Sequence, residues 1–180
     1  MKNSRIIALS AVSAAFAVAL LALGAFIEVI DISCVMFAGM AMMLPLSKKS
    51  YLGAFLAYLA AALLSLILTG GRFAVIVPFV MFFGLHPIVN ALQVKFRINK
   101  ILSVIVKDVW FLLSMFVYFL VLTAVTGYNI FEDFSFIPEN LHKFLIPGLF
   151  VLGAGFFVLY DLVMMRFQRV VDYVVERIKF

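Results

Sequence analysis

Five of the polar side chains that lie inside long apolar runs of this 180-residue sequence are of types that could carry chemistry. They are His86, Asn90, Lys107, Asp108 and Asp161. If these runs cross a membrane, their ionisable groups are costly to bury and are candidates for moving protons or ions. A second interpretation stays open, in which the group is a neutralised structural network. In that network Lys107 extends its ammonium group to the nearer membrane interface.

A second set of polar residues falls between the apolar runs or near their ends. Its members are Glu28, Asp31, Arg72, Tyr128 and Asn129. Arg72 follows two glycines, which leave a flexible turn with accessible backbone amides. Because acidic and basic side chains together complement a solute that carries both charges, we predict a solute-binding group here. The alternative interpretation is the ordinary polarity of solvated loops.

Six apolar runs carry or flank the two sets of polar residues and therefore determine where these residues lie. Each is within or close to the 17–25 residues that a membrane-spanning helix needs. None has the alternating pattern of a membrane β-strand. The runs cover residues 6–27, 29–46, 51–68, 73–92, 101–125 and 144–165. We therefore predict an all-α integral membrane protein, with six transmembrane helices in a domain over residues 1–165.

The composition excludes several classes of protein. Apolar residues make up 67% of the chain and charged residues 13%, whereas soluble domains have about 45–50% and about 25%. This excludes a soluble enzyme, a nucleic-acid-binding domain and a disordered chain. The one cysteine, Cys34, and two histidines are too few for a Cys-rich metal site or a catalytic Cys-His arrangement. We expect no enzymatic activity, metal or cofactor.

The distribution of basic residues predicts the orientation in the membrane. With a cytoplasmic N-terminus, 11 of the 14 Lys and Arg residues fall on the cytoplasmic side, and only Arg72 and Lys143 fall outside. Such a bias is typical of cytoplasmic loops, so we predict a multi-pass protein of the cell membrane with both termini cytoplasmic. Residues 166–180 combine apolar and charged residues at helical spacing, which predicts a short amphipathic cytoplasmic tail.

The first apolar run carries a stripe of small residues. Ala11, Ala15 and Ala19 recur every four residues and therefore share one helix face. Small side chains let another helix approach closely within a membrane. The stripe packs either against this protein's own helices or against a separate membrane subunit.

The alanine stripe after a short basic N-terminus, the six spans, the cytoplasmic termini and the length together resemble the S components of energy-coupling factor (ECF) transporters. In that family the first-helix stripe contacts a transmembrane coupling subunit, which two ATPases drive. The resemblance implies that Ala11, Ala15 and Ala19 dock this subunit and that the outer loops bind a small vitamin-like or nucleobase-like solute. The chain has no phosphate-binding loop of the Walker type, so ATP-driven work would need those partners.

Two other functions stay open at this point. One is a non-transporting membrane protein that scaffolds or regulates a partner. The other is a stand-alone carrier that uses His86, Lys107, Asp108 and Asp161 as a proton relay.

The predicted orientation can be tested by labelling single cysteines in a background without Cys34. In intact cells a cysteine at Lys48 or Asn99 should resist an impermeant thiol reagent, because both positions are expected in cytoplasmic loops. A cysteine at Asp133 should label readily. Labelling after the cells are opened is the control, and the reverse pattern would overturn the orientation.

Overall fold

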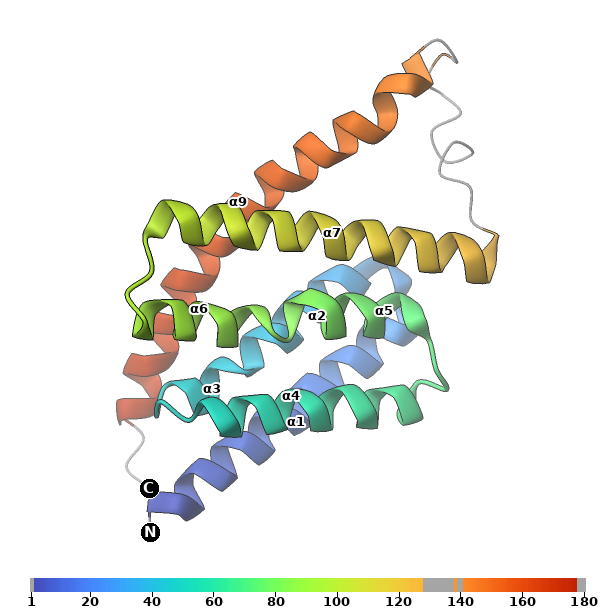
Figure 1. Cartoon of the computed structure of the whole chain (residues 1–180). Coiled ribbons are helices and arrows are strands. Elements are labelled where there is room, and N and C mark those ends of the chain that lie inside the picture. Colours follow the sequence, from blue (N-terminus) through green and yellow to red (C-terminus); the bar gives the residue numbers. More distant parts are fainter. Residues whose placement is uncertain (1, 128–137, 139–140, 178–180) are drawn as a thin grey trace. The chain divides into compact units, whose positions relative to one another are not determined.

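The structure, a computed structural model, describes residues 2–127, 138 and 141–177. Every regular element in these residues is a helix, which confirms the predicted all-α class. The chain divides into two compact units, residues 1–98 with 163–180 and residues 99–162, and helix α9 contributes to both. The elements are α1 (Lys2–Phe26), η1 (Glu28–Ile30), α2 (Asp31–Ala41), α3 (Met43–Leu46), α4 (Tyr51–Leu68), α5 (Phe73–Pro78), the π-helix η2 (Phe79–Phe83), α6 (His86–Lys95), α7 (Lys100–Thr126) and α9 (His142–Arg177). Figure 1 labels the α-helices.

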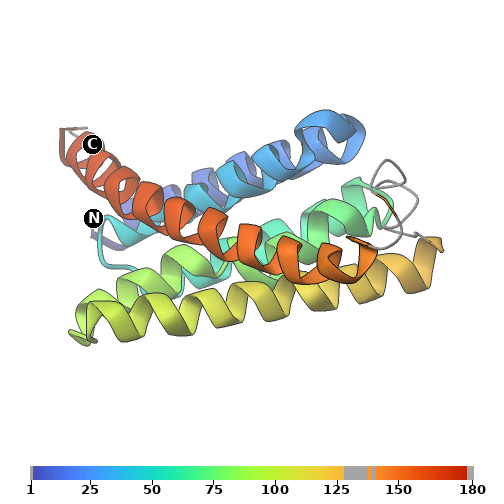
Figure 2. The same ribbon diagram turned by 90° about the horizontal axis from the view of Figure 1, so that it is seen from above.

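Helix α1 organises the first unit by packing against both α2 and α4. Figure 2 shows α1 and α2 running side by side. The contact with α4 is close because Gly53 has no side chain. A Cβ atom at Gly53 would lie 2.6 Å from the Ser10 hydroxyl oxygen of α1. Close approach at small residues is the usual way in which helices associate in lipid.

The break between α2 and α3 follows from a proline. In a continuous helix residue 45 would donate its N–H to the Ala41 carbonyl, but Pro45 has no N–H. The buried Ser13 hydroxyl of α1 donates to that carbonyl instead, at 2.7 Å. The serine thus satisfies a carbonyl that lipid could not, and it links α1 to the break.

The π-helix η2 frees a second carbonyl. The Gly84 N–H donates to the Phe79 carbonyl at 2.8 Å, so it does not make the Val80 bond of a regular α-helix. The Tyr58 hydroxyl of α4 donates to the Val80 carbonyl at 2.9 Å. A side chain from a neighbouring helix therefore supports the irregular turn, as is common where membrane helices are interrupted.

The second unit is an antiparallel helix pair formed by α7 and the part of α9 up to Leu162. Asn99 begins α7 by accepting a hydrogen bond from the Ile101 N–H at 2.9 Å. The helix ends at Gly127, whose φ of 70° suits a residue without a Cβ atom. In α9 the predicted sixth span and the described part of the tail form one uninterrupted helix.

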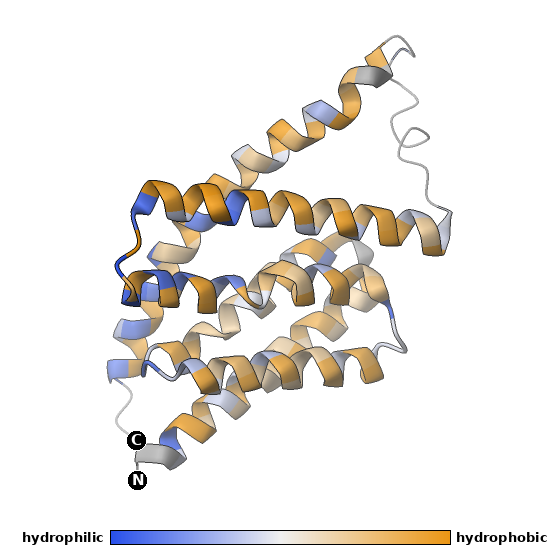
Figure 3. Ribbon diagram, viewed as in Figure 1, coloured by the Kyte–Doolittle hydropathy of each residue, from blue (hydrophilic) through white to orange (hydrophobic). Residues whose placement is uncertain are grey.

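Five helical segments are long and apolar enough to cross a membrane, and their bounds are Ser4–Phe26, Tyr51–Leu68, Phe73–Lys95, Lys100–Thr126 and Phe144–Arg177. Figure 3 shows that hydrophobic residues dominate these helices. Large apolar side chains are exposed along them, including Ile67 at 74% and Val151 at 74%. The protein is therefore a multi-pass membrane protein. The remaining predicted span forms a shorter apolar segment, Asp31–Leu46, interrupted at Met42.

The contact of α2 with η2 provides a test of this packing. A Cβ atom at Gly39 would lie 2.3 Å from the Phe83 carbonyl oxygen, a backbone atom that cannot move alone. Gly39→Ala should therefore destabilise the protein by about 1–3 kcal/mol, as overpacked cores do. Gly148→Ala is the control, because in the described part of the chain no atom outside the adjoining backbone of its own helix lies within 4 Å of its Cβ position. Unfolding in mixed micelles measures both, and an equal effect of the two changes would contradict the close contact.

Candidate functional site

A buried ion pair joins the two helices of the second unit. The Lys107 ammonium nitrogen of α7 lies 2.5 Å from the Asp161 Oδ1 atom of α9, and both side chains are 2% exposed. The pair neutralises two charges that would each be costly in hydrocarbon. The Lys107 ammonium group is therefore buried against Asp161 and does not extend to an interface.

Stacked aromatic rings lie beside the ion pair. Phe111 is one helical turn after Lys107, and Phe157 is one turn before Asp161. The centroids of the two rings are 5.6 Å apart, at an angle of 26°. The rings are 5% and 0% exposed and form an apolar layer next to the charges.

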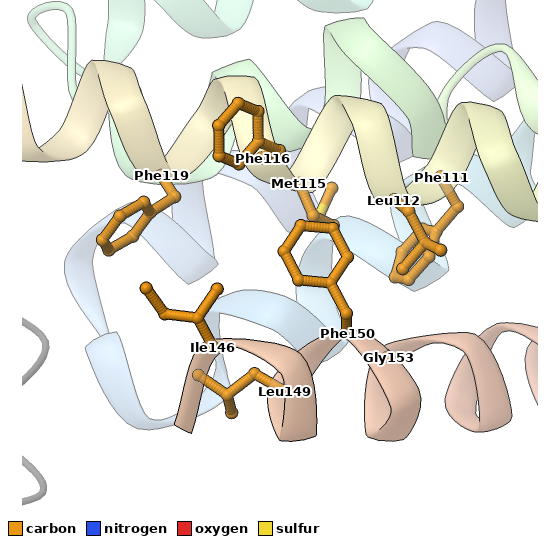
Figure 4. A pocket seen from close by; sticks show the side chains of 9 residues that line it. All are labelled: Phe111, Leu112, Met115, Phe116, Phe119, Ile146, Leu149, Phe150 and Gly153. Carbon is orange, nitrogen blue, oxygen red and sulfur yellow. The ribbon is translucent and has the colours of Figure 1, made fainter. Parts of the chain in front are cut away.

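A pocket opens on the other side of this layer, between α7 and the first turns of α9 (Figure 4). Its volume is about 260 Å³. Six of its lining side chains are Phe111, Met115, Phe116, Phe119, Ile146 and Phe150. Figure 4 shows rings from both helices turned toward the space between them. Its lining side chains contain carbon and one sulfur atom but no nitrogen or oxygen.

The predicted outer set is partly assembled in the first unit. The Arg72 guanidinium donates to the Ala25 carbonyl at 2.5 Å and lies 4.9 Å from the centroid of the Phe26 ring. Arg72 is thereby placed against the end of α1, where helix carbonyls have no partner of their own. After the end of α1 at Phe26, the chain continues into η1, which begins at Glu28, and then into α2, which begins at Asp31.

The other members of that set have different positions. The Asp31 carboxylate accepts a hydrogen bond from the N–H of the next residue, Ile32, in the first turn of its own helix. Tyr128 and Asn129 lie outside the described residues. The structure thus brings Arg72 to the end of α1, next to the connection that carries Glu28 and Asp31.

The remaining inner residues are divided between the units. His86 and Asn90 belong to α6 of the first unit, where the buried His86 ring lies 5.1 Å from the Phe82 ring. Asp108 follows Lys107 in α7, and its Oδ1 atom is buried without a hydrogen-bond partner among the described residues. Among those residues, no group of three or more His, Cys, Asp or Glu side chains is placed to hold a metal ion.

The pocket residues were not predicted from the sequence. Phe111, Met115, Phe116 and Phe150 resemble any other apolar residues of a membrane helix in type and spacing. The one available signal was the density of aromatic residues in the two runs. Comparisons of the chain with protein-family models, with curated proteins and with solved structures found no match.

The ion pair predicts a distinctive double-mutant result. Lys107→Met should destabilise the protein by about 3–5 kcal/mol, because it leaves the Asp161 carboxylate buried without its cation. Adding Asp161→Leu should restore most of that loss, since a well-packed apolar pair replaces a buried ion pair at little cost. Unfolding in mixed micelles measures the coupling between the two positions. Lys100→Met at an exposed lysine of the same helix is the control, and additive losses in the double variant would contradict the pair.

Proposed function

We propose that this protein is the solute-binding membrane subunit of an ECF-type importer. The observation that carries the proposal is the exposure of Ala11, Ala15 and Ala19 on α1. On the same helix Ser13, Ala17 and Leu21 are 0% exposed. The helix therefore uses one face for its own unit and presents the alanines on the other.

An exposed alanine face is well suited to helix docking in a membrane. Lipid offers no reason to place small rather than large apolar residues at a lipid-facing position, whereas a partner helix approaches most closely over small ones. Bulky neighbours, Val12 at 58% and Phe16 at 54% exposure, flank the stripe. The stripe is thus a strip of small side chains beside larger ones, against which a helix of a coupling subunit can pack.

The position of the pocket agrees with solute capture from outside the cell. In this proposal Asp31–Leu46, together with the preceding η1, crosses the membrane as a sixth span. Both termini are then cytoplasmic, as the basic residues predict. In that orientation the pocket lies toward the outer ends of α7 and α9, and the Lys107–Asp161 pair lies toward the cytoplasm.

One observation favours the stand-alone carrier as a second candidate. The buried Oδ1 atom of Asp108 has no hydrogen-bond partner among the described residues and follows the ion pair in sequence. A protonatable carboxylate in such a position is a default candidate for a relay. Solute uptake in cells without any ATPase module would favour the carrier, and strict dependence on ATPases would favour the importer subunit.

The alanine stripe provides the direct test. Ala15→Trp should leave the protein inserted but reduce copurification with a transmembrane coupling subunit and its ATPases at least tenfold, because the indole ring prevents close helix approach. Ala124→Trp is the matched control, since Ala124 is also exposed but lies on α7. Affinity capture from cells that express all subunits measures the yield. If Ala15→Trp copurifies as well as Ala124→Trp, the docking assignment is wrong.

A further inference from the structure

The lining of the pocket between α7 and α9 restricts the chemistry of its ligand. Its walls consist of phenylalanine rings, aliphatic side chains and the Met115 thioether. A hydroxyl, amide or charged group placed among them would lose its hydrogen bonds to water without replacement. The part of a ligand that enters must therefore be uncharged and nearly free of polar atoms.

The ion pair does not alter this conclusion. Lys107 and Asp161 are paired with each other and do not line the pocket. The stacked rings of Phe111 and Phe157 lie between the pair and the pocket along the two helices. A charged ligand group thus has no counter-ion among the described pocket residues.

The volume sets the size of the ligand group. An apolar cavity of about 150 Å³ takes one benzene molecule. At about 260 Å³ this pocket has room for more than a single ring and is of the right size for two fused rings. Aromatic rings on both walls favour a flat aromatic guest, because ring pairs gain from offset and edge-to-face contacts. The thioether adds a favourable contact with an aromatic edge.

The pocket also has a closed end. Gly153 of α9 lies against α7, and a Cβ atom there would be 3.5 Å from Leu112 and 3.8 Å from Phe111. Beyond that contact the ion pair holds the helices together. A compact guest fits a pocket that is closed at this end better than a lipid acyl chain does, because an acyl chain needs a long continuous groove.

We propose that this pocket binds an uncharged, fused two-ring aromatic group of the transported solute, of the size of indole or naphthalene. Calling it the transported solute rests on the proposed function. Any polar or charged part of the solute would then extend from the open end of the pocket.

Binding of tritiated indole to the immobilised full-length protein tests this proposal. A scintillation proximity readout registers protein-bound indole and not indole dissolved in detergent. Excess naphthalene should displace the label, whereas decane, a mimic of a lipid chain, should not. If decane displaces indole as well as naphthalene does, the pocket is a lipid site and the proposal fails.

Variants assign the bound indole to the pocket. Leu149→Trp fills the space from α9 and should weaken indole binding at least tenfold. Leu152→Trp is the matched control, because Leu152 is on the same helix, is 71% exposed and does not line the pocket. Met115→Trp fills the space from α7, the opposite wall, and should weaken indole binding in the same way. Its control is Leu113→Trp, because Leu113 is on α7, is 59% exposed and does not line the pocket. Equal binding by filled and control variants would overturn the assignment.

This experiment can fail separately from the proposed function, because it uses the purified subunit without its partners. Absence of indole binding by wild-type protein that still copurifies with a coupling subunit would overturn the ligand class alone. Indole binding by a wild-type protein that does not copurify with a coupling subunit would overturn the importer function but not the ligand class of the pocket. If a variant with tryptophan in the pocket does not fold, the competition of naphthalene and decane with indole on the wild-type protein still tests the ligand class.

Discussion

The first unit depends on satisfying backbone carbonyls in a medium that offers no water. Each unpaired carbonyl in lipid costs several kcal/mol, and the chain frees such carbonyls at Pro45 and at the π-helix. Ser13 bonds to Ala41 beside the helix break, and Tyr58 bonds to Val80 within the π-helix. Arg72 bonds to Ala25 at the end of α1. In each case the donor comes from another element, so the same bond that satisfies the backbone also fixes how the helices pack.

This constraint gives α1 its two faces. Ser13 must point toward α2 to reach Ala41, and Ser10 lies against α4 at Gly53. Once those contacts orient the helix, the geometry of 3.6 residues per turn turns Ala11, Ala15 and Ala19 away from them. The exposed stripe is therefore a consequence of the packing inside the unit, and it remains available to a partner.

In the second unit, helices α7 and α9 pack tightly at one end and less tightly toward the other. The Lys107–Asp161 pair and the rings of Phe111 and Phe157 hold α7 and α9 together at one end. Toward the other end the rings of Phe116 and Phe150 are 6.2 Å apart and tilted by 44°. The pocket occupies this less tightly packed part of the helix pair.

The sequence by itself determined the all-helical membrane character, because its apolar runs have the length of spanning helices, which satisfy their own backbone, and lack the alternating pattern of membrane strands. It also identified the polar residues of both sets and the alanine spacing of α1. Only the tertiary structure paired Lys107 with Asp161, since 54 residues separate them and several partners had the correct charge. It likewise turned Arg72 to a helix end and distinguished the exposed face of α1 from the buried one. The pocket was beyond sequence reasoning for a physical reason: in a membrane protein the core and the lipid are equally apolar, so Phe116 and Phe150 read the same whether they face a ligand, a helix or a lipid.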